Sequence, residues 1–157
     1  MKKYIYLAGP IADCDYQEAN EWRVYCQEKF EPGIVGISPL RCEPLEKGRR
    51  YSETGSVVKM WSDPRAIATK NWMDTESSDL VLAYLPKKLN DRRPSIGTII
   101  EIGWAIGLRK PLIIVSDDNY LMDHPLIKHN ASWRLNNLDE AIEVISGLFG
   151  DYISQVA

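Results

Sequence analysis

The 157-residue sequence has few of the residues that build metal sites and disulfide frameworks. It contains two histidines and three cysteines, and the cysteines (Cys14, Cys26 and Cys42) are odd in number and widely spaced. Such a set is not typical of paired disulfides or of a zinc site, and it indicates reduced thiols in a cytoplasmic protein. We therefore expect no metal site.

The absence of basic stripes, long apolar runs and common nucleotide-binding motifs excludes further classes of function. The net charge is −3 with no basic stripe, so a nucleic acid polymer is not an expected partner. No apolar run approaches the roughly 20 residues that span a bilayer, and the first residues lead into a strand pattern instead of a secretory signal. Neither a GxGxxG motif nor a P-loop is present. Apolar residues at 45% and charged residues at 26% are typical of a globular protein, and we expect one domain over residues 1–157.

Strand and helix patterns alternate along the chain. Four short apolar runs predict buried strands, at residues 4–8, 34–37, 79–85 and 111–115. Four amphipathic or apolar patterns predict helices, at residues 15–30, 63–75, 95–108 and 138–149. Residues 119–135 are expected to form a loop with one possible short strand. This alternation predicts an α/β fold with a parallel sheet and helices on both faces.

Ligands of such sheets bind beyond the carboxyl ends of the strands. That rule points to Gly9-Pro10, to the loops after Ile37 and Leu85, and to the start of the helix at Ser95. A simple tight turn is the alternative for Gly9-Pro10. Five cations follow the second strand in a long polar loop over residues 40–61: Arg41, Lys47, Arg49, Arg50 and Lys59. A loop of that length is more often functional than a plain insert.

The helix expected from Ser95 carries one charge, Glu101, before Arg109. Its other residues are apolar nearly all round, which predicts a buried helix. A buried carboxylate is costly unless it has a partner or a chemical role. Gly97 and Ala105 lie on the same helical face as Glu101, and their small size leaves room for a ligand. A structural glutamate that bonds a neighbouring Arg or Tyr is the alternative.

Three segments together resemble the nucleoside 2-deoxyribosyltransferase family. They are YIYLAGPI at residues 4–11, DLVLA at residues 79–83, and SIGTIIEIGWA at residues 95–105 followed by Lys110-Pro111. The similarity follows the family order over most of the chain. It implies a flavodoxin-like, doubly wound sheet of about five parallel strands. It also implies exchange of the purine or pyrimidine base of a 2′-deoxynucleoside for another free base, without a metal ion or an organic cofactor.

The resemblance also assigns residues. It places the family's nucleophilic glutamate on Glu101 and the tyrosine that touches it on Tyr6. Ser95 falls at a substrate-contacting position, and Asn71 falls where many members have an Asp that meets the base. An amide there keeps a base contact but is doubtful in proton transfer. An ordinary polar helix residue is the alternative. Asn130 best matches the Asn with which a neighbouring subunit completes each site, so a homo-oligomer is implied.

Several assignments stay open at this point. Gly9 and Gly97 are further candidates for substrate contact. Asp74 or Asp79 is the candidate proton donor to the leaving base. Three aromatic residues are candidates for base stacking, although core packing is the commoner fate of such residues: Trp72, Tyr84 and Trp104. The terminal carboxylate that some family members use is not assigned to residues 154–157.

Three functions compete. The first is base transfer through a covalent deoxyribosyl ester of Glu101 with retained configuration. The second is hydrolysis of 2′-deoxynucleoside 5′-monophosphates. Ser95 at a helix start beside Arg92 and Arg93 suits the phosphate of such a substrate. The third is a non-catalytic nucleotide sensor, against which a buried Glu101 argues.

Overall fold

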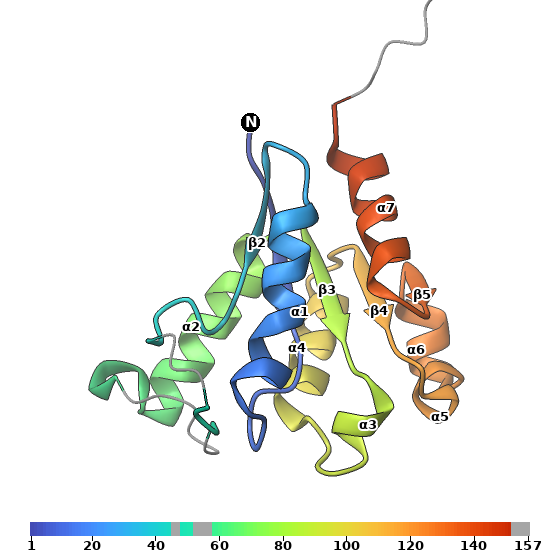
Figure 1. Ribbon diagram of the computed structural model, residues 1–157. Coiled ribbons are helices and arrows are strands. Elements are labelled where there is room, and N and C mark those ends of the chain that lie inside the picture. Colours follow the sequence, from blue (N-terminus) through green and yellow to red (C-terminus); the bar gives the residue numbers. More distant parts are fainter. Residues whose placement is uncertain (45–47, 52–57, 152–157) are drawn as a thin grey trace, which may run out of the picture.

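Five parallel strands form a single sheet in the order β2-β1-β3-β4-β5 (Figure 1). The computed structural model describes residues 1–44, 48–51 and 58–151. The strands are β1 (Lys3–Ala8), β2 (Ile34–Ile37), β3 (Leu80–Tyr84), β4 (Leu112–Val115) and β5 (Trp133–Leu135). Every neighbouring pair is parallel. This order is that of flavodoxin-like folds, so the predicted fold class is confirmed.

The helices lie between the strands and after the last one. They are α1 (Tyr16–Lys29), the single turn η1 (Lys59–Trp61), α2 (Pro64–Ser77), α3 (Lys87–Asn90), α4 (Ile96–Gly107), α5 (Asn119–Met122), α6 (Pro125–Asn130) and α7 (Leu138–Phe149). All four predicted helices and all four predicted strands are present. The short α3, which follows Pro86, was not predicted.

Side-chain caps set the starts of three long helices where the sequence predicts them. Asp15 accepts a hydrogen bond from Glu18 N at 2.9 Å, and the Glu18 carboxylate accepts from Asp15 N at 3.0 Å. Asp63 caps α2 by accepting from the N–H groups of Arg65 and Ala66, and Asn137 caps α7 by accepting from Glu140 N. Each cap gives a free N–H group of the first turn a partner, which fixes where the helix begins.

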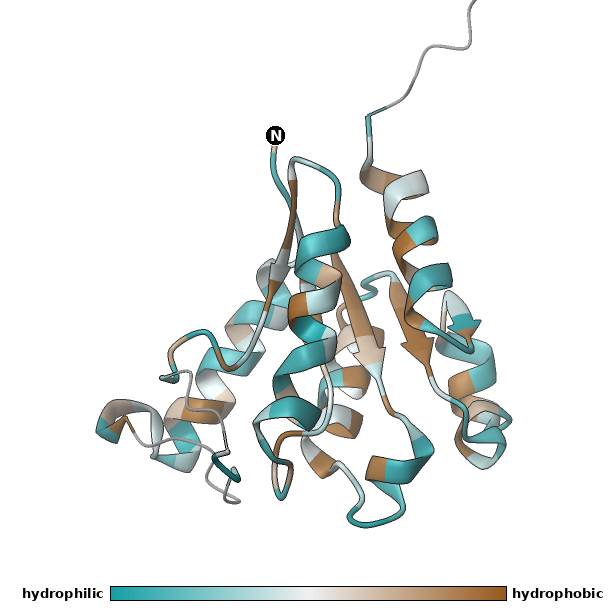
Figure 2. Cartoon of the chain, viewed as in Figure 1, coloured by the Kyte–Doolittle hydropathy of each residue, from teal (hydrophilic) through white to brown (hydrophobic). Residues whose placement is uncertain are grey.

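The sheet has one apolar core on each face because the side chains of a strand alternate between the faces. On β1, Ile5 and Leu7 join the core beneath α1 and α7. Tyr6 and Ala8 join the core that includes α4, α5 and α6. The central strands β3 and β4 are strongly apolar along their length (Figure 2). The alternation on β1 matters for the site, because it directs Tyr6 toward α4.

Two expectations for the second half of the chain are wrong or incomplete. Residues 119–135 contain two short helices in place of a loop, together with the suspected strand β5. Asp118 caps α5 by accepting from Tyr120 N at 3.0 Å. Pro125 opens α6, where a fixed φ suits the first helical turn. These local signals are polar and short, so hydrophobic periodicity alone does not show them.

Helix α4 is not buried all round, contrary to the prediction from its composition. Ile96, Ile99 and Ile100 are 71%, 44% and 47% exposed, whereas Glu101 and Ile102 are buried. The sheet lies under one side of α4 and α2 lies beside it. No described part of the chain covers the third side, which is therefore an exposed apolar stripe.

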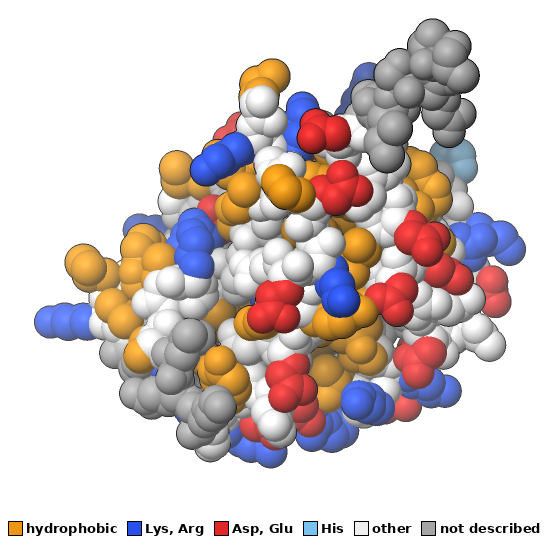
Figure 3. Space-filling view, turned by 45° about the horizontal axis from the view of Figure 1, so that its top comes forward, with side chains coloured by type: hydrophobic (Ala, Val, Ile, Leu, Met, Phe, Trp, Pro, Cys, Tyr) orange, Lys and Arg blue, Asp and Glu red, His pale blue; other side chains and the backbone are white. Residues whose placement is uncertain are grey.

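Two ion pairs tie the polar loop after β2 to other segments: Arg41 pairs with Asp74 of α2, and Arg50 pairs with Asp13 after β1. A third pair, Arg49 with Glu43, lies within the loop itself. Lys47 lies outside the described residues. On the face shown in Figure 3, Lys and Arg side chains are interspersed with Asp and Glu. Among the described helices, none has the length and apolar character needed to cross a membrane.

Candidate active site

A pocket of about 310 Å³ opens at the carboxyl ends of β1, β2 and β3. Its walls come from residues 9–14 after β1, residues 39–43 after β2, Trp61, one side of α2, and residues 92–98 at the start of α4. Glu101 lies in the pocket wall. The strand-end rule therefore predicted this location correctly, and the volume falls within the roughly 300–1,000 Å³ of small-molecule sites.

Glu101 is bound on one oxygen only. Tyr6 Oη donates to Glu101 Oε1 at 2.7 Å, and Asn71 Nδ2 donates to the same atom at 3.0 Å. Oε2 receives no hydrogen bond from the described residues. The side chain is 6% exposed. The carboxylate is thus fixed in orientation by β1 and α2, while its second oxygen is left for the pocket.

Burial raises the pKa of Glu101 from 4.5 to about 7. The hydrogen bond from Tyr6, the Arg23 charge, the hydrogen bond from Asn71 and the Lys70 charge all oppose this rise. Burial and the adjacent Glu101 charge raise the pKa of Tyr6 well above its ordinary value, so its hydroxyl stays a donor. Because the pKa of Glu101 is about 7, its protonated and ionised forms are close in free energy near neutral pH.

Arg23 provides a permanent positive charge behind the site. It is 1% exposed and donates to the backbone carbonyls of Leu7 at 3.1 Å, of Gly9 at 2.9 Å, and of Ala19. No carboxylate of the described chain lies within ion-pair distance of it. Burial lowers the pKa of Arg23 to about 10, which still leaves the guanidinium charged at neutral pH. Its charge favours the ionised form of Glu101.

The structure brings most of the predicted site residues together. Gly9, Asn71, Ser95 and Gly97 line the pocket with Glu101. Tyr6 lies behind them and reaches the site through its bond to Glu101.

Asn130 does not belong to this pocket. It ends α6, and its Nδ2 donates to Leu126 O at 2.8 Å within the same helix. A contact between Asn130 and a neighbouring subunit stays a prediction.

The two glycines of the pocket differ in their surroundings. A Cβ atom on Gly9 would lie 2.6 Å from Cζ2 of Trp22 and 3.0 Å from Tyr84 O. The turn after β1 therefore needs glycine because Trp22 and the Tyr84 carbonyl leave no room for a side chain. Gly97 has open space where a Cβ atom would be, so it leaves the start of α4 accessible.

Ser95 occupies the N-cap position of α4 but does not cap the helix with its side chain. Its hydroxyl instead pairs with Thr98 Oγ1 at 2.7 Å. Its backbone N–H donates to Asn90 Oδ1 at 3.0 Å, which holds the preceding loop. Serine is a favoured N-cap residue, but here its side chain makes no capping bond; the predicted start of the helix is confirmed.

The predicted stacking residues do not line the pocket. Trp72 and Trp104 pack edge to face on α2 and α4 with ring centroids 5.3 Å apart. Tyr84 packs against Trp22 at 5.0 Å. Trp61 from η1 is the aromatic side chain in the wall, and nothing in the sequence pattern indicated it.

Two charged residues near Glu101 were also missed by the sequence analysis. Arg23 falls on the apolar face of α1, four residues after Ala19 and three before Cys26, and a charge in that register was a usable signal. Lys70 stands beside Asn71 in the pocket wall, and its i,i+4 spacing to Asp74 gives only a weak signal.

The described residues contain no cluster of three or more His, Cys, Asp or Glu side chains placed to hold a metal ion. The three cysteines are free.

The chain is similar in sequence and in fold to known proteins. The family model described as Nucleoside 2-deoxyribosyltransferase matches residues 5–147. A solved 2-deoxyribosyltransferase from Bacillus psychrosaccharolyticus is 17% identical with a TM-score of 0.61, over 88% of this chain and 90% of that one. A solved CMP N-glycosidase from Clostridium botulinum is 16% identical with a TM-score of 0.54, over 94% of this chain and all of that one. At such identities the two structures show the shared fold. No curated protein sequence matches the chain.

The raised pKa of Glu101 predicts that this residue destabilises the fold at neutral pH. Between pH 4.5 and about 7 the folded chain holds a proton on Glu101 that the unfolded chain has lost, so stability falls as the pH rises through that window. Glu101→Gln should remove this dependence and raise the free energy of unfolding at pH 8 by up to about 3 kcal/mol. At pH 4.5 the two proteins should be nearly equal.

Urea unfolding at both pH values measures this effect. The matched control is Glu143→Gln on the exposed side of α7, which should change stability little at either pH. Equal stabilities of wild type and Glu101→Gln at pH 8 would contradict the assignment.

Proposed function

Since the chain belongs to the nucleoside 2-deoxyribosyltransferase family, we propose that it exchanges the base of a 2′-deoxynucleoside for another purine or pyrimidine base. The observation that carries this proposal is the one-sided hydrogen bonding of Glu101. Tyr6 and Asn71 hold Oε1, and Oε2 remains available to a substrate in the pocket. The substrates are small deoxynucleosides and free nucleobases.

The proposed reaction has two displacement steps at the anomeric carbon. In the first, Glu101 Oε2 bonds to that carbon as the C–N bond breaks, and the bonding electrons leave with the base. In the second, a nitrogen of the incoming base attacks from the opposite face and releases the carboxylate. Two inversions retain the configuration. The burial of Glu101 in the partly apolar pocket wall limits the access of water to its carboxylate, which favours transfer over hydrolysis.

A second candidate is an N-glycosidase for 2′-deoxynucleoside 5′-monophosphates. The start of α4, which Ser95 does not cap, and the pocket-lining Arg92 favour an anion there. A solved structure with this fold is a CMP N-glycosidase. Against it, Arg92 already pairs with Glu18 at 2.9 Å. We therefore place transfer between unphosphorylated nucleosides first.

Incubation of the protein with a deoxynucleoside and a different free base, followed by chromatography, tests the proposal directly. A new nucleoside is expected from the wild type. Tyr6→Phe should lower the rate by roughly one to two powers of ten, the effect of one charge-assisted hydrogen bond. Glu101→Gln should lower it by several powers of ten, because the amide is a poor nucleophile. Glu143→Gln is the control. Release of free base and sugar alone would identify a hydrolase, and no turnover would reject base transfer between deoxynucleosides.

A comparison of kcat/KM for a deoxynucleoside and its 5′-monophosphate separates the two candidates. We expect the deoxynucleoside to be the better substrate. A tenfold or larger preference for the monophosphate, about 1.4 kcal/mol of transition-state binding, would reverse our choice. In that case Arg92→Ala or Ser95→Ala should erase the preference.

We also propose that the protein is a homo-oligomer assembled on the exposed stripe of α4. The stripe consists of Ile96, Ile99, Ile100, Gly103 and Gly107. Both of these glycines have open space at the Cβ position, so the backbone of another helix can approach closely. Ile96 also lines the pocket, so a second copy seated there would extend the wall of the site. The same helix of a second copy is the complementary surface for a symmetric contact.

Ile100→Glu should dissociate this oligomer, because two charges would be buried at a symmetric contact. Sedimentation should show the wild type as an oligomer and the variant as the 17.9 kDa chain. Val24→Glu, at a comparably exposed apolar residue of α1, is the control and should leave the assembly intact. An active wild-type monomer would contradict the proposal.

A further inference from the structure

The leaving base becomes more basic as its bond to the sugar breaks, so it needs a proton. The sequence suggests Asp74 and Asp79 as donors, and neither lines the Glu101 pocket. Asp79 lies at the opposite end of the sheet, where it accepts from Lys3 Nζ at 3.1 Å. Asp74 binds Arg41 through both carboxylate oxygens, at 2.6 and 2.7 Å. The site therefore needs a different proton donor.

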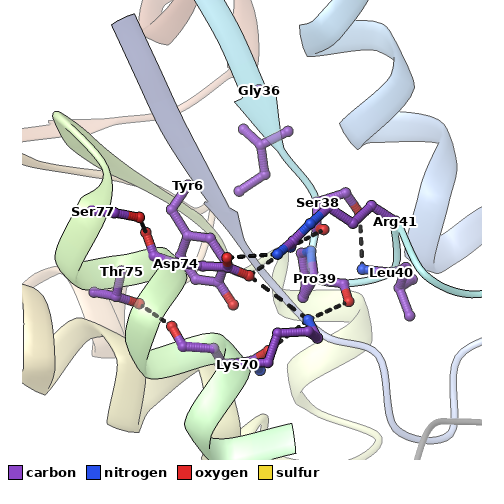
Figure 4. A network of polar contacts seen from close by, with 12 residues as sticks. Tyr6, Gly36, Ser38, Pro39, Leu40, Arg41, Lys70, Asp74, Thr75 and Ser77 are labelled. Carbon is purple, nitrogen blue, oxygen red and sulfur yellow. Dashed lines mark hydrogen bonds and ion pairs between the residues drawn. The ribbon is translucent and has the colours of Figure 1, made fainter. Parts of the chain in front are cut away.

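Lys70 lines the pocket beside Asn71 and Glu101. Its Nζ donates to Pro39 O at 2.8 Å and to Asn71 Oδ1 at 3.1 Å, and it lies 3.7 Å from Asp74 Oδ2 (Figure 4). The side chain is 9% exposed. An ammonium group has three N–H donors, and only two of them have an acceptor within hydrogen-bond distance among the described residues.

The surroundings of Lys70 make its ammonium group a stronger acid. Burial lowers its pKa from the ordinary 10.5; the Asp74 charge opposes this shift and the Arg41 charge adds to it. The other titratable groups that face it, Cys42 and Glu101, favour the charged form. An acid whose pKa approaches the working pH transfers protons efficiently.

Other groups in the pocket wall are less suited to give a proton. The amide of Asn71 has no ionisable proton at neutral pH. Burial raises the pKa of the Cys14 thiol, which makes it a weaker acid. The carboxylates of Asp13 and Glu43 are each engaged by an arginine, at 3.3 and 3.1 Å.

We propose, on the basis of the proposed function, that Lys70 is the general acid for the leaving base. As the C–N bond breaks, its electron pair moves to the base and a ring nitrogen of the base takes a proton from Nζ. Nζ becomes a neutral amine while Glu101 Oε2 forms the ester. In the second step the incoming base bonds to the anomeric carbon, its N–H proton passes to Nζ, and the Glu101 carboxylate is released. Each turnover thus restores both groups.

Two substitutions of Lys70 separate proton transfer from charge. Lys70→Met removes both, whereas Lys70→Arg keeps the charge and the donors but does not release a proton at working pH. Both should lower kcat for an ordinary deoxynucleoside by a factor on the order of 10² to 10⁴, the usual contribution of a general acid. Lys87→Met, at an exposed lysine of α3, is the control. A Lys70→Arg enzyme with near-wild-type kcat would overturn the proposal.

A series of deoxynucleosides whose bases differ in acidity gives a readout that a structural role of Lys70 would not change. The deficit of Lys70→Arg should shrink as the leaving base becomes more acidic, and it should nearly vanish for 7-methyl-2′-deoxyguanosine, or for the most acidic 5-substituted deoxyuridine if pyrimidines are preferred. Such bases depart without a proton. An equal deficit on every base would show that Lys70 only positions Asn71, and the proposal would be wrong. Failure of the wild type to cleave any of these substrates would instead reject the proposed function.

Discussion

The buried carboxylate of Glu101 is the constraint on which the rest of the site depends. A carboxylate in this position is costly unless hydrogen bonds and nearby charge compensate it. Tyr6 and Asn71 bind one of its oxygens, and Arg23 contributes positive charge from the other side of β1. This compensation is incomplete, since the pKa still rises to about 7. The result is a group that is rigidly oriented and easily converted between its two protonation states.

The register of β1 determines whether this arrangement can form. Tyr6 pairs with Ile37 of β2 and with Val81 of β3, which points its ring toward α4. A shift by one residue would turn Tyr6 into the opposite core and leave Glu101 without its shortest hydrogen bond. Ile5 and Leu7, the neighbours of Tyr6 on β1, pack in the core on the opposite face of the sheet, and the same shift would remove both side chains from that core. Packing on the far side of the sheet therefore helps to maintain the site.

The fold and the position of Glu101 at the site were predictable because each depends on a strong, local signal. Alternating apolar runs and N-caps predict the strands and long helices, and one charge in an apolar helix predicts Glu101. Lys70 and Trp61 were missed because their positions depend on how α2 and the loop after β2 fold against each other. The apolar composition of α4 was interpreted as burial within one chain. The structure divides it between an inner side facing the sheet and an exposed stripe, and composition alone does not distinguish these two environments.

The two cations near Glu101 differ in a way that suits different tasks. Arg23 is bound to three backbone carbonyls and has a guanidinium that keeps its proton, so its charge is constant through a reaction. Lys70 has a lowered pKa and one N–H directed to no protein acceptor within hydrogen-bond distance in the described chain. Exchanging the two residue types would impair both tasks. A lysine at position 23 would bind the backbone carbonyls with a less rigid geometry, and an arginine at position 70 would not give up a proton. The residue types at 23 and 70 therefore favour a fixed charge behind Glu101 and an exchangeable proton beside it.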